Sequence, residues 1–491
     1  MAIYTSPKPH QIEGAKFLVG KKVAIIGAKT GKGKTLIVLA CVHKHVFGKD
    51  DYVVVFAPPK AYESVWRQET KKHSDMKVIA LDEAHKRWLK VKTVTFLLEY
   101  DIVLAKYSQV TADYYEFLSI ILPGRITIYD EAHKLKTPET KLVRLLSNLT
   151  RDAKAKWAVT ATAIGNSILD LWGLMHFLDS RILGTEWQFK KEYCVLEEVV
   201  IGWTTRYGRK VPDTRLQVSD YKNLDQLKAL MTNYLWSVDS DLNVKFHDIR
   251  YAITEHEDRV YIQAAHGILS SENMKGFAQR MPDLQRAVDG AYDIKGEKTT
   301  GFRGSKYAEY YKEISKLISK NESVILFAEF LDTFDMLYNL IKEDFPGVPI
   351  YRISGSYMEY NETTVKLPCI ILATIGGTES LNLKFANHVL CYSVPFAVNS
   401  FIQLVGRITR MDSDFLEDLN VYLPICDTTI DLYKYNYLMR NAALINEVLG
   451  RDANLPEKKL NDMRAGLLAE LRKELLWRTK VLKKNSTTQV T

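Results

Sequence analysis

Five largely apolar runs of strand length recur through the first 162 residues, separated by segments with apolar residues at helical spacing. These runs are Val23–Gly27, Tyr52–Ala57, Asp101–Tyr107, Arg125–Tyr129 and Trp157–Thr162. Continuous apolar strands that alternate with helices are typical of a parallel sheet covered on both faces. Such sheets bind ligands beyond the carboxyl ends of their strands, so every strand end is a candidate site.

A second series of apolar strands begins after residue 301, with Val324–Ala328, Cys369–Thr374 and Val421–Ile425 as members. Between the two series the chain is less regular, and the stretch 295–304, rich in Gly, Lys and Thr, predicts a hinge. The predicted class is α/β, with two parallel-sheet lobes, a mostly helical insertion after the first lobe and a helical C-terminal tail. The expected domains are residues 1–180, 181–300, 301–440 and 441–491.

Composition narrows the class of protein. Hydrophobic and charged contents of 46% and 26% over 491 residues indicate a soluble globular chain with several domains. The five cysteines are scattered without metal-ligand spacing, and no membrane span or signal peptide is evident, so we expect a cytoplasmic protein without a membrane partner. The net charge of +8 is compatible with phosphate-rich partners and equally with a merely basic enzyme.

The stretch Ala28–Thr35 lies between an apolar strand and a helix, which is the context of a phosphate-binding loop. Its glycines let successive N–H groups face an anion, Lys34 would reach the β and γ phosphates, and Thr35 would ligate Mg²⁺. The strict pattern has Gly where this chain has Ala28. A chance Gly/Lys turn is the alternative. The residues expected to contact the nucleotide here are Thr30, Gly31, Lys32, Gly33, Lys34 and Thr35.

A helix start containing His10 and Gln11 lies upstream of this loop. A glutamine amide offers one donor and one acceptor, which matches the N7 and N6 edge of adenine. Gln11, with His10 beside it, is therefore the candidate for selecting ATP. An ordinary surface glutamine is the alternative.

The tetrapeptide Asp-Glu-Ala-His occurs twice, at Asp82–His85 and at 130–133. An ATPase needs one carboxylate for Mg²⁺ and a second for the attacking water, both at a strand end beside the phosphate loop. Either copy could supply this chemistry. The second copy ends a strongly β-forming run, so we assign Asp130 to Mg²⁺, Glu131 to the water and His133 to relaying the nucleotide state, and we interpret the first copy as a decoy.

The segment Thr160–Ser167, continued by Asp170–Leu174 and Phe177–Leu178, resembles the third motif and following helix of the Swi/Snf-like branch of superfamily two helicases. The phosphate loop and its flanking segments also resemble that family's earlier motifs. The resemblance implies two RecA-like lobes with ATP between them and duplex DNA across their tops. It also implies that Thr160 and Thr162 couple hydrolysis to movement of the lobes.

Two later segments extend the resemblance. The segment 374–383 resembles the fifth motif, which makes Thr374, Gly377 and Asn382 candidates for DNA contact. The segment 403–410 resembles the sixth motif, so Gln403, Arg407 and Arg410 are candidates for completing the ATP site from the second lobe. Alone, such arginines are usually surface charges. Further candidates for DNA contact, near other strand ends, are Pro58, Lys60, Lys106, Ser354 and Gly355.

The region after the first lobe contains one alternating segment, 199–211, which predicts a hairpin with a basic and aromatic tip. Such a tip could hold a strand junction, but a solvated hairpin is the simpler interpretation. Asp213 and the segment Asp220–Lys222 imitate a nuclease site, although their interval is too short for the usual intervening structure. The basic tail beyond residue 471 could touch phosphates or be a solvated end.

Together these motifs predict an ATP- and Mg²⁺-dependent motor that acts, as a monomer, on double-stranded and branched DNA without sequence selectivity. Small stand-alone members resemble branch-migration helicases that regress forks. The alternatives are a duplex translocase that displaces proteins or serves a restriction complex, and a scaffold that binds DNA and uses ATP as a switch.

Overall fold

The computed structural model describes most of the chain up to residue 449. The described residues are 3–28, 33–46, 51–160, 167–206, 209–238, 244–269, 274–293, 296–299, 301–361, 364–374, 386–395, 401, 404 and 419–449.

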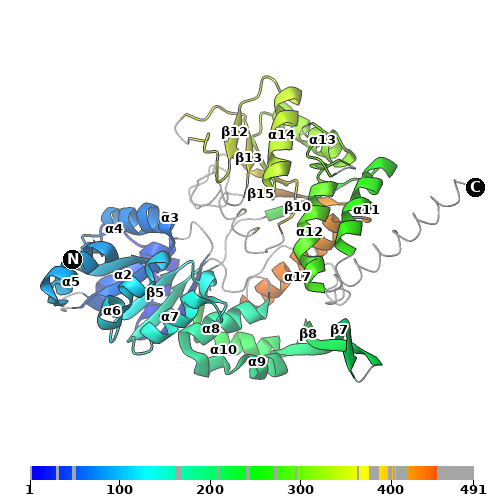
Figure 1. Ribbon diagram of the computed structural model, residues 1–491. Coiled ribbons are helices and arrows are strands. Elements are labelled where there is room, and N and C mark those ends of the chain that lie inside the picture. Colours follow the sequence, from blue (N-terminus) through cyan, green and yellow to red (C-terminus); the bar gives the residue numbers. More distant parts are fainter. Residues whose placement is uncertain are drawn as a thin grey trace, which may run out of the picture.

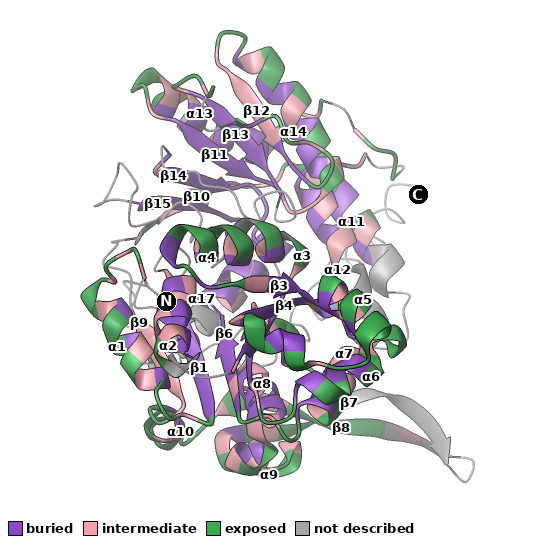
Figure 2. Cartoon of the chain, turned by 90° about the vertical axis from the view of Figure 1, so that its left-hand side faces the viewer, coloured by how far each residue is buried: buried purple, intermediate pink, exposed green. Residues whose placement is uncertain are grey.

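The first lobe is built on a seven-stranded sheet with the order β3-β4-β2-β5-β6-β1-β9. Every pairing in it is parallel, as the continuous apolar runs predict. Its strands are β1 (Val23–Ala28), β2 (Val53–Ala57), β3 (Val78–Ala80), β4 (Ile102–Lys106), β5 (Ile126–Asp130), β6 (Ala155–Val159) and β9 (Leu235–Val238). All residues of β1, β2 and β5 are buried, so both sheet faces are covered (Figure 2).

Alternate residues of these strands serve two separate apolar cores. Ile25, Val54 and Phe56 belong to one core, whereas Ile26, Val53 and Val55 belong to the other. Successive side chains of a strand point to opposite faces, which explains this division. The first-lobe helices are α1 (Pro9–Leu18), α2 (Lys34–Val46), α3 (Pro59–Ala61), α4 (Gln68–His73), α5 (Leu81–Val91), α6 (Ala112–Ile121), α7 (Lys141–Leu149), α8 (Ile168–Leu183), α9 (Glu186–Tyr193) and α10 (Leu224–Met231).

The second lobe contains a six-stranded parallel sheet with the order β10-β15-β14-β11-β13-β12 (Figure 1). Its strands are β10 (Val244–Arg250), β11 (Val324–Phe327), β12 (Ile350–Ile353), β13 (Ile370–Ala373), β14 (His388–Cys391) and β15 (Leu419–Ile425). Its helices are α11 (Glu255–Leu269), α12 (Met274–Val288), α13 (Ser305–Ser319), α14 (Leu331–Asp344) and α17 (Ile430–Leu449). Two parallel sheets with helices confirm the predicted α/β class.

The chain passes from one sheet to the other earlier than predicted. Strand β9 pairs with β1 of the first sheet, and β10 pairs with β15 of the second. The crossing therefore falls between residues 238 and 244, and the predicted hinge at 295–304 lies after α12, within the second lobe. The range 181–300 is thus divided between the lobes instead of extending the first lobe alone. The reason is that β9 has only four residues and β10 is partly exposed, and the partners of both strands lie far away in sequence.

A long antiparallel hairpin, formed by β7 (Cys194–Arg206) and β8 (Arg209–Tyr221), projects from the first lobe beside α9 (Figure 1). The predicted hairpin at 199–211 is therefore present, but its strands are longer than the alternating segment. Together with β9 and β10, it makes the range 181–300 less helical than expected.

A buried ion network joins the helices of the second lobe. The Nζ atom of Lys306 donates to the carboxylates of Asp289 at 2.8 Å and Asp431 at 2.7 Å. The side-chain amide of Gln285 donates to both carboxylates at 2.9 Å. All four residues are almost fully buried, and both carboxylates share one ammonium group and accept further hydrogen bonds from a neutral amide. The network thereby fixes α17, which packs against α10 of the first lobe (Figure 1).

Candidate nucleotide site

Three strands of the first sheet bring candidate residues to one edge. Ala28 ends β1, Asp130 ends β5 and Thr160 directly follows β6, the strand that lies between them. Because the strands are parallel, these carboxyl ends lie together at one edge of the sheet. Thr160 is buried, and its N–H donates to the carbonyl of Ile26 at 3.1 Å. This edge is where a nucleotide is expected.

The carboxylate of Asp130 is held at both oxygens. The indole N–H of Trp66 donates to Oδ2 at 2.9 Å, and the backbone N–H of Glu131 donates to Oδ1 at 2.9 Å. The hydroxyl of Tyr107 donates to the Asp130 carbonyl at 2.8 Å. Trp66 lies in a π-helical segment, Tyr62–Arg67, and such irregular turns often occur at functional sites. Asp130 is therefore buried in one fixed orientation.

The next residue, Glu131, adopts a left-handed backbone conformation, with φ 48° and ψ 47°. Its half-buried carboxylate lies 3.2 Å from Nδ1 of His133. This turn places two carboxylates and an imidazole at the end of one strand. A left-handed conformation is uncommon outside glycine and often occurs at functional sites.

Burial and the neighbouring Glu131 carboxylate raise the pKa of Asp130 to about 6. The hydrogen bond from Trp66 and the charge of Lys34 act in the opposite direction but do not compensate fully. Two carboxylates in this environment favour a nearby cation. Mg²⁺ uses one or two carboxylates together with phosphate oxygens, and Asp130 and Glu131 supply two carboxylates at this strand end.

The described part of the phosphate loop is closely packed. Gly33 has a φ of +70°, and a Cβ atom at this position would lie 2.2 Å from Nε2 of Gln11. Glycine therefore meets both the backbone and the space requirement. The Nζ atom of Lys34 donates to the carbonyl of Ala28 at 2.9 Å. Thr35 is half-buried in the first turn of α2, whose N-terminus favours an anion. Thr30, Gly31 and Lys32 lie outside the described residues.

Gln11 lies in the first turn of α1, where its side chain is buried. Its Oε1 accepts a hydrogen bond from the backbone N–H of Lys8 at 2.8 Å. The amide therefore lies beside the phosphate loop in a fixed orientation. His10 precedes it and is half-buried.

The other first-lobe candidates follow neighbouring strands. Pro58 directly follows β2 and is half-buried, and Lys60 lies in the short helix α3. Lys106 ends β4, and its Nζ lies 4.6 Å from the centre of the Tyr62 ring. All three positions lie at the carboxyl edge, one or two strands from Asp130.

In the second lobe, Ser354 and Thr374 follow the adjacent strands β12 and β13 and are buried. The Ser354 hydroxyl accepts bonds from the N–H groups of Ser356 and Tyr357, each at 3.1 Å, which stabilises the turn containing Gly355. Several predicted residues lie outside the described residues, namely Thr162, Gly377, Asn382, Gln403, Arg407 and Arg410.

The first Asp-Glu-Ala-His copy lies away from this site. Asp82 and Glu83 are in the first turn of α5, after the edge strand β3, and four strands separate β3 from β1. The His85 ring lies 4.7 Å from the ring of Tyr114. This copy therefore belongs to an edge helix.

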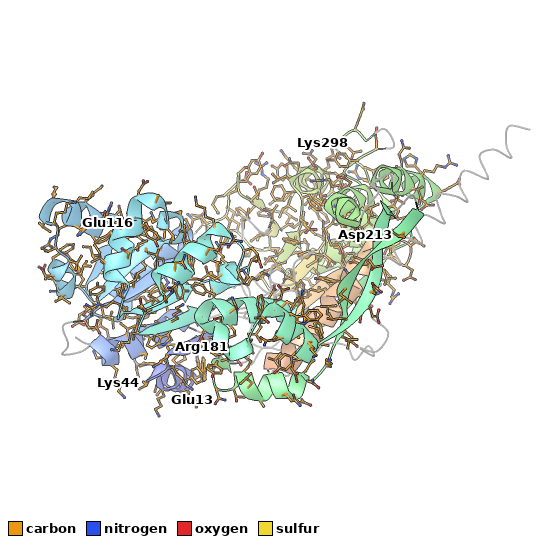
Figure 3. The ribbon with its side chains drawn as sticks, turned by 60° about the horizontal axis from the view of Figure 1, so that its bottom comes forward. Glu13, Lys44, Glu116, Arg181, Asp213 and Lys298 are labelled. Carbon is orange, nitrogen blue, oxygen red and sulfur yellow. The ribbon has the colours of Figure 1, made fainter. Side chains whose placement is uncertain are left out.

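The nuclease-like residues do not form a compact site. Asp213, which Figure 3 labels, lies on β8 together with Asp220, and both residues are exposed. Residues so spaced on an extended strand are roughly 20 Å apart, which is too far for a shared metal ion.

The sequence pattern did not reveal what holds Asp130. Trp66 and Tyr107 were visible only as members of a helical segment and a strand end, and both touch Asp130 in the fold. A tryptophan about two helical turns after the Pro58–Pro59 strand end is the signal that could have been used.

A search of the described residues finds no helix with the length and apolar character needed to cross a membrane.

A predicted phosphate loop beside paired carboxylates, at the carboxyl edge of one of two parallel-sheet lobes, is the arrangement expected of a nucleoside-triphosphatase. The model of the SNF2-related domain matches residues 10–280, and that of the helicase conserved C-terminal domain matches residues 306–412. The chain therefore belongs to the SNF2-related family. It is an ATP-dependent helicase or translocase of the Swi/Snf-like branch of superfamily two.

Sequence identity between this chain and individual proteins is low. An uncharacterized ATP-dependent helicase of Bacillus subtilis, YqhH, is 21% identical over 477 residues, which are 91% of this chain and 80% of that protein. The putative helicase/translocase YwqA of the same bacterium is 23% identical over 424 residues, 78% of this chain and 42% of the relative. Zebrafish DNA repair and recombination protein RAD54-like is 26% identical over 208 residues, 38% of this chain and 28% of the relative.

Two solved structures are also similar. One is the SWI2/SNF2 ATPase core of Sulfolobus solfataricus in complex with dsDNA, at 17% identity and a TM-score of 0.41, covering 92% of this chain and 98% of that chain. The other is the core domain alone, at 18% identity and a TM-score of 0.40, covering 92% of both chains.

The raised pKa of Asp130 predicts an acid limit for ATP turnover. The ionised carboxylate is the form that binds a cation, so kcat/KM for ATP should fall as the pH drops below about 6. Trp66→Phe removes a hydrogen bond that lowers this pKa, so the acid limb should move to higher pH. Trp88→Phe alters a buried tryptophan elsewhere in the lobe and serves as the control. If the pH profiles of kcat/KM for wild type and Trp66→Phe were superimposable, Asp130 would not be the group that sets the acid limit.

Proposed function

We propose that this protein is an ATP-driven motor that moves along duplex DNA and remodels branched DNA by branch migration and fork regression. The main observation that supports an ATP-driven motor is the buried Asp130 carboxylate, which lies beside Glu131 and Lys34 at the carboxyl edge of the first sheet. The name of the RAD54-like relative, a DNA repair and recombination protein, supports a role on recombination intermediates.

In this proposal Lys34 contacts the β and γ phosphates, and Thr35 and Asp130 hold Mg²⁺. Bound Mg²⁺ supplies electrostatic neutralisation of the charge that develops on the phosphoryl oxygens. Glu131 orients and deprotonates the attacking water. Its left-handed backbone turn, which fixes its carboxylate beside Asp130, supports this role. His133, 3.2 Å from the Glu131 carboxylate, relays the state of the nucleotide.

The packing of Gln11 against Gly33 supports its role in recognising adenine, with His10 beside it. From the second lobe we assign Gln403, Arg407 and Arg410 to completing the site. Arginines that neutralise charge on the γ-phosphate are worth about 10³ to 10⁵ in rate. Thr160 and Thr162 then couple hydrolysis to movement of the lobes.

We propose that the duplex lies across the carboxyl edges of both sheets and is held through its phosphates. The residues assigned to this grip are Pro58, Lys60, Lys106, Ser354, Gly355, Thr374, Gly377 and Asn382. A grip on phosphates reads no base sequence, so the motor would act on any duplex. We further propose that it works as a monomer.

A second candidate function is a duplex translocase that displaces proteins or serves a restriction complex. Its support is that curated relatives include the ISWI chromatin-remodeling ATPase ISW1 of Saccharomyces cerevisiae, which is 21% identical over 453 residues. It needs the same nucleotide site and the same duplex grip, so only the preferred DNA structure separates the two.

Three substrates separate these roles: a mobile four-way junction, a replication fork and a blunt duplex that carries a bound protein. We expect ATP-dependent conversion of the junction and the fork into their migrated products. Movement on the blunt duplex without reaction on either branched substrate would remove the branch-migration assignment in favour of protein displacement. Glu131→Gln, carried in parallel, shows whether each reaction requires hydrolysis.

A further inference from the structure

Two adjoining cavities lie at the amino ends of the first-sheet strands, on the side opposite the nucleotide site. Their volumes are about 350 and 520 Å³, and Lys22 and Lys154 line both. Lys22 directly precedes β1, and Lys154 directly precedes β6. We call the two cavities together the basic groove. The strands between the groove and the nucleotide edge have five or six residues, so roughly 16 Å of sheet separates the two sites.

The lining of the basic groove has an excess of positive charge. Among the described residues that line it, the acidic one is Asp179, which pairs with Arg181 at 2.7 Å. Lys44 and Arg181, which line the groove, are labelled in Figure 3 on the side of the first lobe that comes forward there. The cationic residues that line the groove are Lys21, Lys22, Lys44, Arg151, Lys154, Lys156 and Arg181.

Two of these cations donate hydrogen bonds to groups that carry no charge. Lys21 and Lys156 donate to neutral backbone carbonyls, at 2.8 Å to Asn233 and 3.2 Å to Phe177. Lys154 lies 3.9 Å from Asp51, a carboxylate that already pairs with Arg125. Hydrogen bonds to neutral carbonyls position a lysine without neutralising it, so the groove keeps a net positive field that attracts anions.

The groove wall also contains partly desolvated polar groups. Burial lowers the pKa of the half-buried Lys156 to about 8, and the charge of Asp179 only partly offsets this effect. Within the described residues, Nδ1 of His176 is buried without a hydrogen-bond partner. An anion in the groove would favour the charged form of Lys156 and offer acceptors to such groups. These features point to a ligand with several negative charges.

We propose that the basic groove binds the phosphate backbone of a second DNA segment, namely another arm of the branched substrate held at the carboxyl edge. This inference rests on the proposed function. Exposed lysines and arginines spread over two adjoining cavities suit the repeated charges of a backbone, which a protein contacts at several phosphates without reading bases. The groove would hold one arm still while the motor moves along another.

The test compares wild type with a triple variant, Lys22→Gln, Arg151→Gln and Lys154→Gln, in which all three altered side chains are exposed. The matched control is Lys86→Gln, Lys90→Gln and Lys141→Gln, which removes the same charge from exposed helix positions. Binding to a four-way junction and to a blunt duplex of about 15 base pairs is measured by fluorescence anisotropy over a salt series. ATP hydrolysis stimulated by the short duplex is measured in parallel.

We expect the groove variant to bind the junction at least about tenfold more weakly than wild type. The slope of log K against log salt should become shallower by roughly 2 to 3, because each lost phosphate contact contributes about 0.9. Its affinity for the short duplex and its duplex-stimulated ATP turnover should match those of the control. Unchanged junction binding, or an equal loss on both DNAs, would overturn the inference.

Failure of the groove inference can be distinguished from failure of the proposed function. If wild type fails to migrate junctions but the groove variant still loses junction affinity selectively, the groove stands as a DNA site and the branch-migration assignment falls. If wild type migrates junctions and the variant binds them unchanged, the inference falls alone. Chemical acylation of lysines in wild type provides a second measurement. We expect bound junction, but not bound short duplex, to protect Lys22 and Lys154 from acylation.

Discussion

Replacing Glu131 by Gln is expected to lower the turnover number for ATP by about 10² to 10⁴ while leaving ATP binding intact, because the change removes the base and preserves the shape of the side chain. The left-handed turn at this position depends on backbone and size more than on charge. Steady-state ATP hydrolysis with saturating duplex DNA, together with equilibrium binding of a fluorescent ATP analogue, measures the two effects separately.

The chain supplies its own control for this substitution. Glu83 occupies the same place in the first Asp-Glu-Ala-His copy, but it is exposed on α5 and pairs with Arg67 at 3.2 Å. Glu83→Gln should therefore leave turnover unchanged. Loss of turnover in Glu83→Gln with normal turnover in Glu131→Gln would reverse the choice between the two copies.

Replacing Lys34 by Ala is expected to have the second large effect. Its ammonium group is held at the loop by the Ala28 carbonyl, close enough to Asp130 to influence the pKa of that carboxyl. Removing a charged donor aimed at phosphate oxygens costs about 10² to 10³ in rate, and here it should also weaken ATP binding. Titration with the same ATP analogue and steady-state hydrolysis measure both losses.

Lys90→Ala, at an exposed position of α5, is the matched control and should hydrolyse ATP like wild type. A Lys34→Ala protein that binds and hydrolyses ATP normally would show that this loop does not hold the triphosphate.

Much of the fold could be predicted from the sequence because its central strands are buried on both faces. The run that became β2 is apolar throughout and the runs that became β4 and β5 are largely apolar, since both sides of each strand pack against helices. The position of Asp130 followed from the same pattern, because a polar residue that ends such a run must lie at the carboxyl edge of a parallel sheet.

The remaining features depend on contacts between distant segments. The hydrogen bond from Trp66 to Asp130 joins residues 64 positions apart, and no local pattern specifies it. The crossing between lobes was misplaced because β9 and β10 carry polar residues and are recognisable only through their pairing with β1 and β15. The hairpin was found at its turn, but the mixed residues towards its base concealed the length of β7 and β8.

The central claim is that hydrolysis at the Asp130 edge drives movement along duplex DNA. Displacement of a triplex-forming strand from a plain duplex tests it most directly, because a motor that passes the triplex removes the third strand and a static binder does not. We predict ATP-dependent displacement by wild type and none by Glu131→Gln, although both proteins bind the duplex. Wild type that hydrolyses ATP in the presence of duplex DNA yet leaves the triplex intact would contradict the account and favour an ATP-switched scaffold.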